Sequence, residues 1–166
     1  LGALTGVTSG SVTVSIKEAE GYGTIVNGND DDWGLFDKQA NGDWLGQELV
    51  VNGGFDTDLS GWDVTEAGQT VEWDSGRLHI ITDGTGCGVR QVLLSDNITY
   101  RVVLNYEAVS GALKYQIGTS GYALSSTQVI SLDHLADSAN FFLYRSSGAA
   151  EGYFDNVSVK EVLKNA

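Results

Sequence analysis

The sequence predicts an all-β protein, an antiparallel β-sandwich preceded by an irregular N-terminal arm. Short runs rich in Val, Ile, Thr, Tyr and Phe recur along the chain, and many alternate apolar with polar residues. Clusters of Gly, Asn, Asp and Ser separate these runs, and the chain contains 22 glycines and no proline. Helix signals are nearly absent, since the longest candidate, 130–136, is short and is followed by loop-forming residues. Many short strands without intervening helices favour a sandwich.

Seven runs carry the strand prediction. They span 71–73, 78–82, 89–93, 100–106, 113–117, 141–144 and 153–159. Alternation places Tyr100, Val102 and Leu104 on one strand face. The same rule places Tyr153, Asp155, Val157 and Val159 on a common face, so that a carboxylate would lie at the mouth of an apolar stripe.

Charge limits the possible partners of this chain of 166 residues. Its formal net charge is −13, because 22 acidic side chains outnumber 9 basic ones. Such a surface repels nucleic acid, anionic membranes and acidic polymers, and favours cations or neutral partners such as uncharged sugars. No apolar run approaches about 20 residues, so no membrane insertion is expected. Cys87 is the single cysteine, so no internal disulfide can form, and we interpret it as a small buried hydrophobe.

The chain divides into three parts. Residues 47–166 form the predicted sandwich, and residues 20–46 form an irregular arm that carries Trp33 and Trp44. Residues 1–19 contain the hexapeptide VSIKEA at 14–19, which is close to VSVKEV at 157–162. Residues 1–19 are therefore interpreted as the closing strand of a preceding module or a linker, although chance similarity of two amphipathic strands remains open. The start of the chain, which lacks methionine, predicts a processed product or a piece of a longer chain.

From Glu48 onward the sequence resembles a known family. Its motifs are NGGFD at 52–56, SGW at 60–62, GRLHI at 76–80, NITY at 97–100 and GYFDNVSV at 152–159. In this order they resemble the galactose-binding-like jelly rolls of carbohydrate-binding modules, especially families 4, 9 and 22. Related units are frequent in tail and head appendages of bacteriophages. Independently, NGG at 52–54 allows positive φ and a bulge, and Phe55 and Trp62 are expected in the core.

The resemblance implies a structural calcium ion where the first and last strands meet. Its ligands would be Asp56, Asp155 and backbone carbonyls of Asn52 and its neighbours, since calcium prefers oxygen ligands. The alternative is that Asp155 only accepts backbone hydrogen bonds where its strand begins.

Binding is favoured over catalysis. The two histidines, His79 and His134, have no metal-ligand spacing, and His79 is expected on an exposed strand face. Sugars are bound by aromatic faces together with planar amide or guanidinium groups. The aromatic candidates are Trp73, Tyr106, Tyr115 and Tyr122, and the polar candidates are Arg90, Gln91, Asn105, Gln116 and Arg145. For each aromatic residue, packing in the core or at an edge is the alternative, and the sequence does not indicate which sheet face is open.

The resemblance and the composition together predict a non-catalytic glycan-binding or surface-adhesion module of a larger assembly, in a bacteriophage tail or head appendage. Its partners would be neutral glycans or other virion subunits, its location a virion surface or the extracellular space, and its arm the contact of a homo-oligomer. Two alternatives remain open: a virion decoration domain that binds no sugar, and a module of a secreted polysaccharide-degrading enzyme.

Overall fold

The fold is all-β, as predicted. The structure is a computed structural model that describes residues 37–38, 44–65 and 70–163. The strands are β1 (Asp37–Lys38), β2 (Trp44–Glu48), β3 (Asp63–Thr65), β4 (Thr70–Asp74), β5 (Arg77–Asp83), β6 (Gly88–Val92), β7 (Thr99–Ile117), β8 (Ser120–Leu124), β9 (Gln128–Leu135) and β10 (Asn140–Leu163). No helix of the described residues is long and apolar enough to cross a membrane. The helix candidate at 130–136 lies mostly in strand β9.

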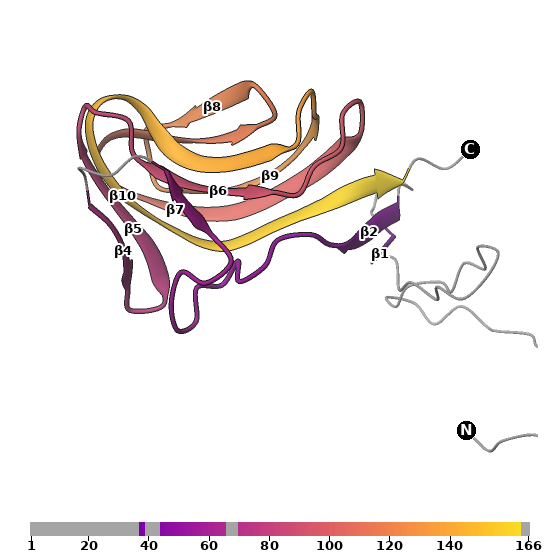
Figure 1. The fold of residues 1–166 in the computed structure, drawn as a ribbon, viewed down its shortest axis with the longest axis horizontal. Coiled ribbons are helices and arrows are strands. Elements are labelled where there is room, and N and C mark those ends of the chain that lie inside the picture. The colour runs from indigo at the N-terminus through magenta and orange to yellow at the C-terminus, as the bar shows by residue number, and fades with distance from the viewer. Residues whose placement is uncertain (1–36, 39–43, 66–69, 164–166) are drawn as a thin grey trace, which may run out of the picture.

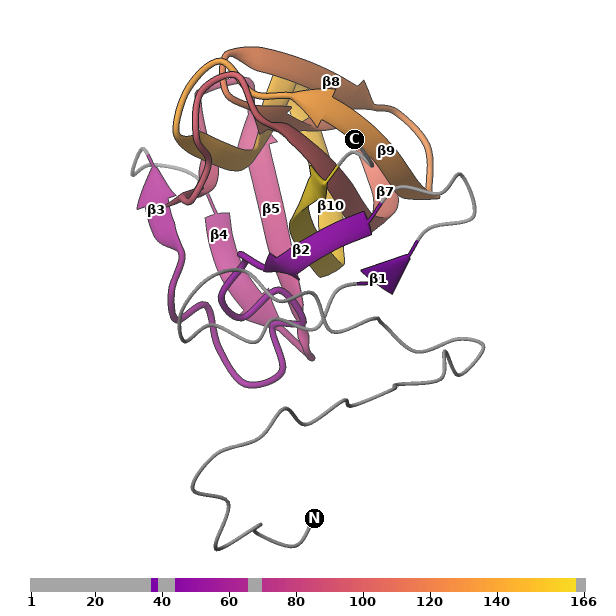
Figure 2. The same cartoon turned by 90° about the vertical axis from the view of Figure 1, so that its right-hand side faces the viewer.

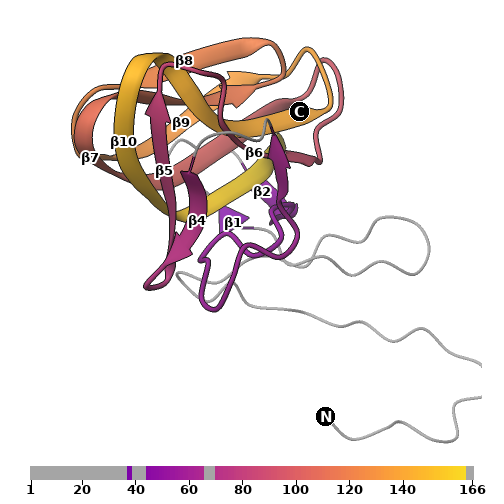
Figure 3. The same cartoon turned by 60° about the vertical axis from the view of Figure 1, so that its left-hand side comes forward.

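Two long strands organise the molecule. β7 has 19 residues and β10 has 24, and they pair antiparallel from Phe141 opposite Ile117 to Glu161 opposite Tyr100. Both strands bend as they run side by side (Figures 1 and 3). The bend coincides with register shifts between Arg145 and Gly152, and with left-handed Gly111 (φ 62°) and Gly148 (φ 65°). Each long strand therefore contributes to two layers.

The bend divides the continuous sheet into two layers that enclose a common interior (Figure 2). In the first layer the order is β3–β6–β10–β7–β8, with β10 contributing residues 140–144. In the second it is β4–β5–β10–β7–β9, with β10 contributing residues 149–154 beside β5. β2 joins the last residues of β10, and β1 pairs with β2. The result is the predicted antiparallel sandwich of the jelly-roll type.

The core lies between the layers and confirms several predictions. Tyr100, Val102 and Leu104 are buried on one face of β7. Phe55 and Trp62 are also buried, with ring centroids 5.5 Å apart, and the Trp62 indole N–H donates to the Asn52 carbonyl at 3.1 Å. Cys87 is fully buried, as expected of a small hydrophobe.

Alternation fails near the end of β10. Tyr153, Asp155, Val157 and Val159 do not share a face, because the register of β10 against β7 shifts between Asp155 and Ser158 and Asn156 takes a φ of 50°. Phe154, Val157 and Val159 are buried, whereas Tyr153 and Asp155 face outward. The predicted position of a carboxylate in an apolar stripe is therefore wrong: Asp155 stays on the outer face with Tyr153, and the bulge at Asn156 turns Val157 and Val159 to the core face.

The NGGF segment forms a tight corner against the end of β10. Positive φ falls on Asn52 (54°) and Phe55 (48°), and not on the glycines between them. Gly53 is needed for a different reason: a Cβ there would lie 2.9 Å from the carbonyl carbon of Val157 and closer still to its oxygen. The Val157 N–H donates to the Gly53 carbonyl at 2.8 Å, so this corner attaches the start of the sandwich to its last strand.

The start of the sandwich differs from the predicted boundary. Strand β2 crosses residues 46 and 47, and Leu45 is buried, so Trp44 and Leu45 belong to the sheet. Trp33 and the VSIKEA hexapeptide lie outside the described residues.

Candidate functional site

A groove crosses the outer face of the first layer. Its volume is about 360 Å³, and we call it the aromatic groove; it is lined by Thr65, Arg90, Gln116, Phe142 and Tyr144. Strand register explains its composition, because Arg90 of β6, Phe142 of β10 and Gln116 of β7 lie directly opposite one another in adjacent strands.

A glycine lets one aromatic ring of the groove lie close to the neighbouring strand. Gly88 lies opposite Tyr144, and a Cβ at Gly88 would lie 2.8 Å from Cδ2 of that ring. The Tyr144 ring therefore packs against the backbone of β6. Phe142 meets Tyr144 edge to face with centroids 6.2 Å apart, and Lys114 Nζ lies 5.6 Å from the Tyr144 centroid. Phe142 and Tyr144 are half-buried, so each ring keeps part of its surface open.

Hydrogen-bonding groups adjoin these rings. Arg90 Nε is buried and has no hydrogen-bond partner among the described residues, and the nearest carboxylate oxygen, Asp63 Oδ2, lies 3.7 Å away. The Gln116 amide donates to the Gly118 carbonyl at 3.0 Å, which fixes the orientation of its side chain. Aromatic faces beside a planar guanidinium and an amide provide the chemistry that binds sugar rings through their C–H faces and hydroxyl groups.

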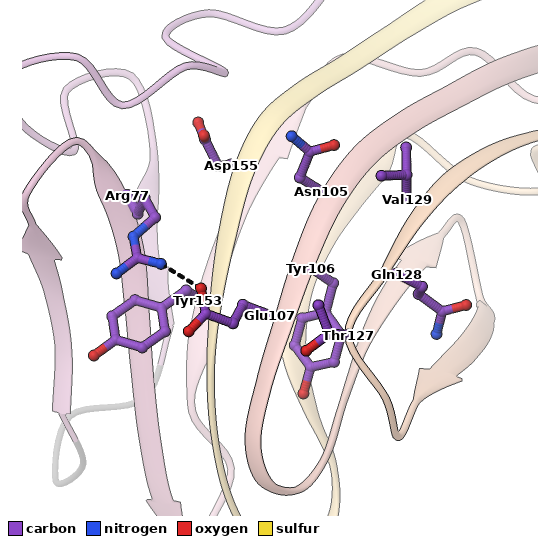
Figure 4. Close-up of a pocket in the computed structure, with 9 residues that line it drawn as sticks. All are labelled: Arg77, Asn105, Tyr106, Glu107, Thr127, Gln128, Val129, Tyr153 and Asp155. Carbon is purple, nitrogen blue, oxygen red and sulfur yellow. Dashed lines mark hydrogen bonds and ion pairs between the residues drawn. The ribbon is translucent and has the colours of Figure 1, made fainter.

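A second groove lies on the outer face of the other layer (Figure 4). We call it the acidic groove, and its volume is about 330 Å³. Its lining residues are Arg77, Asn105, Tyr106, Glu107, Thr127, Gln128, Val129, Tyr153 and Asp155. Arg77 Nη1 lies 2.6 Å from Glu107 Oε2, and the guanidinium stands 4.0 Å from the Tyr153 ring centroid. The Tyr153 ring is therefore already covered by a protein cation.

His79 is buried, contrary to the prediction of an exposed position. It stacks on Tyr153 at 4.2 Å with the rings nearly parallel at 9°. Its two ring nitrogens lie 3.2 Å from Glu72 Oε1 and 3.1 Å from Glu151 Oε1. The strand alternation is correct, but neighbouring side chains cover the histidine. The rings of both His79 and Tyr153 are thus occupied within the protein.

The ligand residues predicted from the sequence lie in different places, among them the core, the aromatic groove and the acidic groove. Tyr115 is 1% exposed, so its ring cannot stack on a ligand from solvent. Tyr106 lines the acidic groove but is only 2% exposed, so almost none of its ring is open to a ligand. Gln91 is also buried, and its amide bonds to both the N–H and the carbonyl of Val51, at 3.1 and 2.7 Å. These three predictions are corrected on grounds of burial. Arg90 and Gln116 line the aromatic groove, while Asn105 lines the acidic groove.

Tyr122 belongs to a ring cluster with Tyr115 and His134. The Tyr115 ring stacks on Tyr122 at 5.1 Å, and its hydroxyl shares a hydrogen bond with His134 Nε2 at 2.8 Å. Burial raises the pKa of Tyr115 to about 12 and lowers the pKa of His134, so both groups are held neutral at pH 7. This cluster is structural.

Trp73 and Arg145 lie apart from the aromatic groove. Trp73 is 42% exposed on β4, and its indole N–H donates to the Phe55 carbonyl at 2.6 Å. Arg145 follows Tyr144 in β10, and its backbone N–H donates to the Cys87 carbonyl at 2.9 Å.

The residues proposed for calcium lie around the NGGF corner. Asn52 donates its side-chain amide to the Asp58 and Ser60 carbonyls, and both carboxylate oxygens of Asp155 accept hydrogen bonds from Asn156. Among the described residues, no group of three or more His, Cys, Asp or Glu side chains gathers to hold a metal ion. The predicted site has two side-chain carboxylates, Asp56 and Asp155, so main-chain oxygens would have to supply the remaining ligands that calcium needs. The calcium site stays a prediction.

Thermal melts with and without a chelator test this site. If Asp56 and Asp155 hold calcium, EDTA lowers the melting temperature, excess calcium restores it, and Asp155→Ala removes the response, because an ion bound only to the folded state stabilises that state. Asp63→Ala, on a different strand, serves as the control. A melting curve that EDTA leaves unchanged rules the site out.

Sequence reasoning did not name Phe142, Tyr144 or Lys114 as ligand residues. A signal was present in the run Phe141-Phe142-Leu143-Tyr144, which is apolar or aromatic on both strand faces. Phe141 and Leu143 fill the core, so Phe142 and Tyr144 must lie on the outer face. Aromatic residues on the solvent face of a predicted strand mark a candidate binding surface.

Comparison with solved structures shows the class of fold. The CBM22-1 xylan-binding domain of Xyn10C from Paenibacillus barcinonensis is matched with a TM-score of 0.50 at 12% identity, over 72% of this chain and 97% of that one. A CBM22-1–GH10 structure of xylanase Xyn10B from Clostridium thermocellum, complexed with xylohexaose, gives 0.50 at 13% identity, over 72% of this chain and 29% of that one.

A third similar structure is an arabinose-bound GH51 α-L-arabinofuranosidase. It gives a TM-score of 0.52 at 18% identity over 75% of this chain, which spans only 27% of the length of that enzyme. No protein-family profile matches the sequence, and no curated protein matches it. The chain has the jelly-roll fold found in carbohydrate-binding modules.

Proposed function

We propose that this domain binds glycans without catalysis, through the aromatic groove. The observation that carries the proposal is the row of Arg90, Phe142 and Gln116 across three adjacent strands, with Tyr144 beside it. An extended chain of sugar rings can lie along such a row, with one face on the aromatic rings and its hydroxyl groups bonded to the guanidinium and the amide. The similar xylan-binding domain and the enzyme complexed with xylohexaose support this class of ligand.

Loss of the aromatic rings tests the proposal. We expect Phe142→Ala and Tyr144→Ala each to weaken glycan binding by tenfold or more, since stacking supplies much of the affinity for a sugar ring. Affinity electrophoresis against soluble polysaccharides, followed by isothermal titration with the best of them, measures the change. Trp73→Ala is the matched control, because Trp73 is an exposed aromatic residue on a strand of the other layer.

Each binding result for these variants has its own interpretation. Retained binding in Phe142→Ala and Tyr144→Ala, with loss in Trp73→Ala, would move the site to the other layer. No binding to any polysaccharide by the folded chain would contradict the proposal. Circular dichroism of each variant shows whether the fold is intact.

We further propose that the domain serves as a surface module of a larger assembly. The sequence motifs favour a bacteriophage tail or head appendage, exposed on the virion, in which the N-terminal arm joins copies of the chain. Repetition of a modest glycan site on an oligomer would raise its affinity by avidity. Light scattering of the full chain and of a chain lacking residues 1–36 tests the arm. An unchanged oligomeric state after this deletion would contradict its role.

The alternative is a module attached to a polysaccharide-degrading enzyme. It is favoured by the two similar structures in which this fold spans only 27% and 29% of an enzyme chain. In that case the domain would deliver an attached catalytic unit to its polymer. The sequence that flanks this chain in its parent protein distinguishes the two settings.

A further inference from the structure

The two layers of the sandwich carry opposite charge balances. The strand segments of the first layer, 63–65, 88–92, 113–117, 120–124 and 140–144, contain two cationic residues, Arg90 and Lys114, and one carboxylate, Asp63. The second-layer segments 70–74, 77–83, 99–107, 128–135 and 149–155 contain seven carboxylates and two guanidinium groups. The carboxylates are Glu72, Asp74, Asp83, Glu107, Asp133, Glu151 and Asp155, and the guanidinium groups are those of Arg77 and Arg101.

The cations of the two layers also differ in their partners. In the second layer Arg77 pairs with Glu107, and Arg101 pairs with Asp133 through two nitrogens. Among the described residues, the carboxylate near Arg90 is that of Asp63, whose Oδ2 lies 3.7 Å from Arg90 Nε, beyond hydrogen-bond distance, and Asp63 is 71% exposed. Lys114 lies over the Tyr144 ring. The aromatic groove thus has one cation in its lining, Arg90, and a second beside its Tyr144 ring, Lys114. Within the described part of the chain neither is hydrogen-bonded to a carboxylate, although the formal net charge of the protein is −13.

We propose that the ligand of the aromatic groove is an acidic glycan, a polysaccharide that carries carboxylate or sulfate groups. This inference rests on the proposed glycan function and changes the expected ligand from neutral to anionic. Arg90 and Lys114 lie on opposite sides of β10, so an anionic substituent can meet a cation while its sugar ring lies on Phe142 or Tyr144. The guanidinium fork of Arg90 forms charge-assisted hydrogen bonds with a carboxylate or a sulfate, which are stronger than bonds to a neutral hydroxyl.

The acidic surface elsewhere does not exclude this ligand. At physiological salt the Debye length is about 8 Å, so exposed carboxylates of the opposite layer are largely screened from the groove. Charges inside a partly desolvated groove are screened less. Local charge therefore decides what the groove holds, while the distant acidic residues mainly slow the approach of a polyanion.

The experiment compares neutral and acidic polymers on the full chain. The probes are polygalacturonate for carboxylates, dextran sulfate for sulfates, and xylan and unmodified dextran as neutral polymers, each titrated at 0.15 M salt. We expect one or both acidic polymers to bind at least tenfold more tightly than either neutral polymer, and comparison of the two identifies the anionic group. We expect Arg90→Gln and Lys114→Gln each to weaken that binding at least fivefold.

A matched charge change provides the control. Arg77→Gln removes the same charge from the opposite layer, and we expect it to change the affinity less than twofold. If Arg77→Gln weakens binding as much as Arg90→Gln, the attraction is non-specific and the proposal is overturned. Neutral polymers bound as tightly as acidic ones would overturn the acidic ligand but leave the glycan function standing. Binding to none of the four polymers would contradict both.

Discussion

Gly53→Ala is expected to lower the free energy of unfolding by about 3 kcal/mol or more, because its new Cβ would overlap the backbone of Val157. Backbone carbonyl atoms cannot rotate away as a flexible side chain can, so the corner or the end of β10 must shift. Such a shift would also weaken the hydrogen bond from the Val157 N–H to the Gly53 carbonyl, now 2.8 Å. Chemical denaturation of wild type and variant measures the change.

Gly54→Ala is the matched control for this prediction. The two glycines are adjacent, but the nearest atom to a Cβ at Gly54 is an Asp56 side-chain oxygen at 3.5 Å, an ordinary contact. We expect Gly54→Ala to change stability by less than about 1 kcal/mol. Equal losses in the two variants would mean that backbone freedom, and not the close approach to Val157, explains the need for glycine.

Trp62→Ala is expected to cost about 3–5 kcal/mol, the usual range for removing a large buried aromatic side chain. Trp62 is 6% exposed and lies between Phe55 and Phe141, with ring centroids 5.5 and 6.3 Å away. Its removal leaves a cavity that a corner fixed by positive φ at Asn52 and Phe55 cannot easily close. A fall in melting temperature of about 10 °C or more is the measurable result.

Trp62→Phe separates the ring from its hydrogen bond. This variant keeps an aromatic ring in the core but loses the indole N–H that donates to Asn52, and it should cost about 1–3 kcal/mol. If Trp62→Phe is as destabilising as Trp62→Ala, the hydrogen bond and not the packing supports the corner.

Much of the fold follows from residue patterns. In β7, Tyr100, Val102 and Leu104 alternate with polar neighbours, and a strand has only two faces, so alternation alone predicts their burial. The same rule fails in β10, because Asn156 introduces a bulge whose position depends on the partner strand β7. Bulges arise from pairing between distant segments, which local alternation does not record.

The candidate site was harder to predict than the fold. A planar polar group in a strand suits sugar binding, so the sequence indicates Arg90 and Gln116, and both line the aromatic groove. The rings of Tyr106 and Tyr115 are suitable for stacking on sugars, but the fold leaves them only 2% and 1% exposed. Which side of a strand is covered depends on where the second layer packs, and this information lies in segments far away in the sequence. The run at 141–144 is apolar or aromatic on both strand faces, and the packing of the two layers decides that Phe141 and Leu143 are buried while Phe142 and Tyr144 lie outside.

The long strand β10 also determines when the chain can fold during its synthesis. Strands β2, β5 and β6 each pair with β10, which begins at Asn140 and ends at Leu163. A ribosome must therefore synthesise the chain as far as β10 before these earlier strands meet their partner. Until then their edges are unpaired and their apolar faces lie open to other chains, the condition under which β proteins aggregate. The acidic residues that surround these strands repel neighbouring copies at that stage, so the net charge of −13 protects the nascent chain as well as the finished surface.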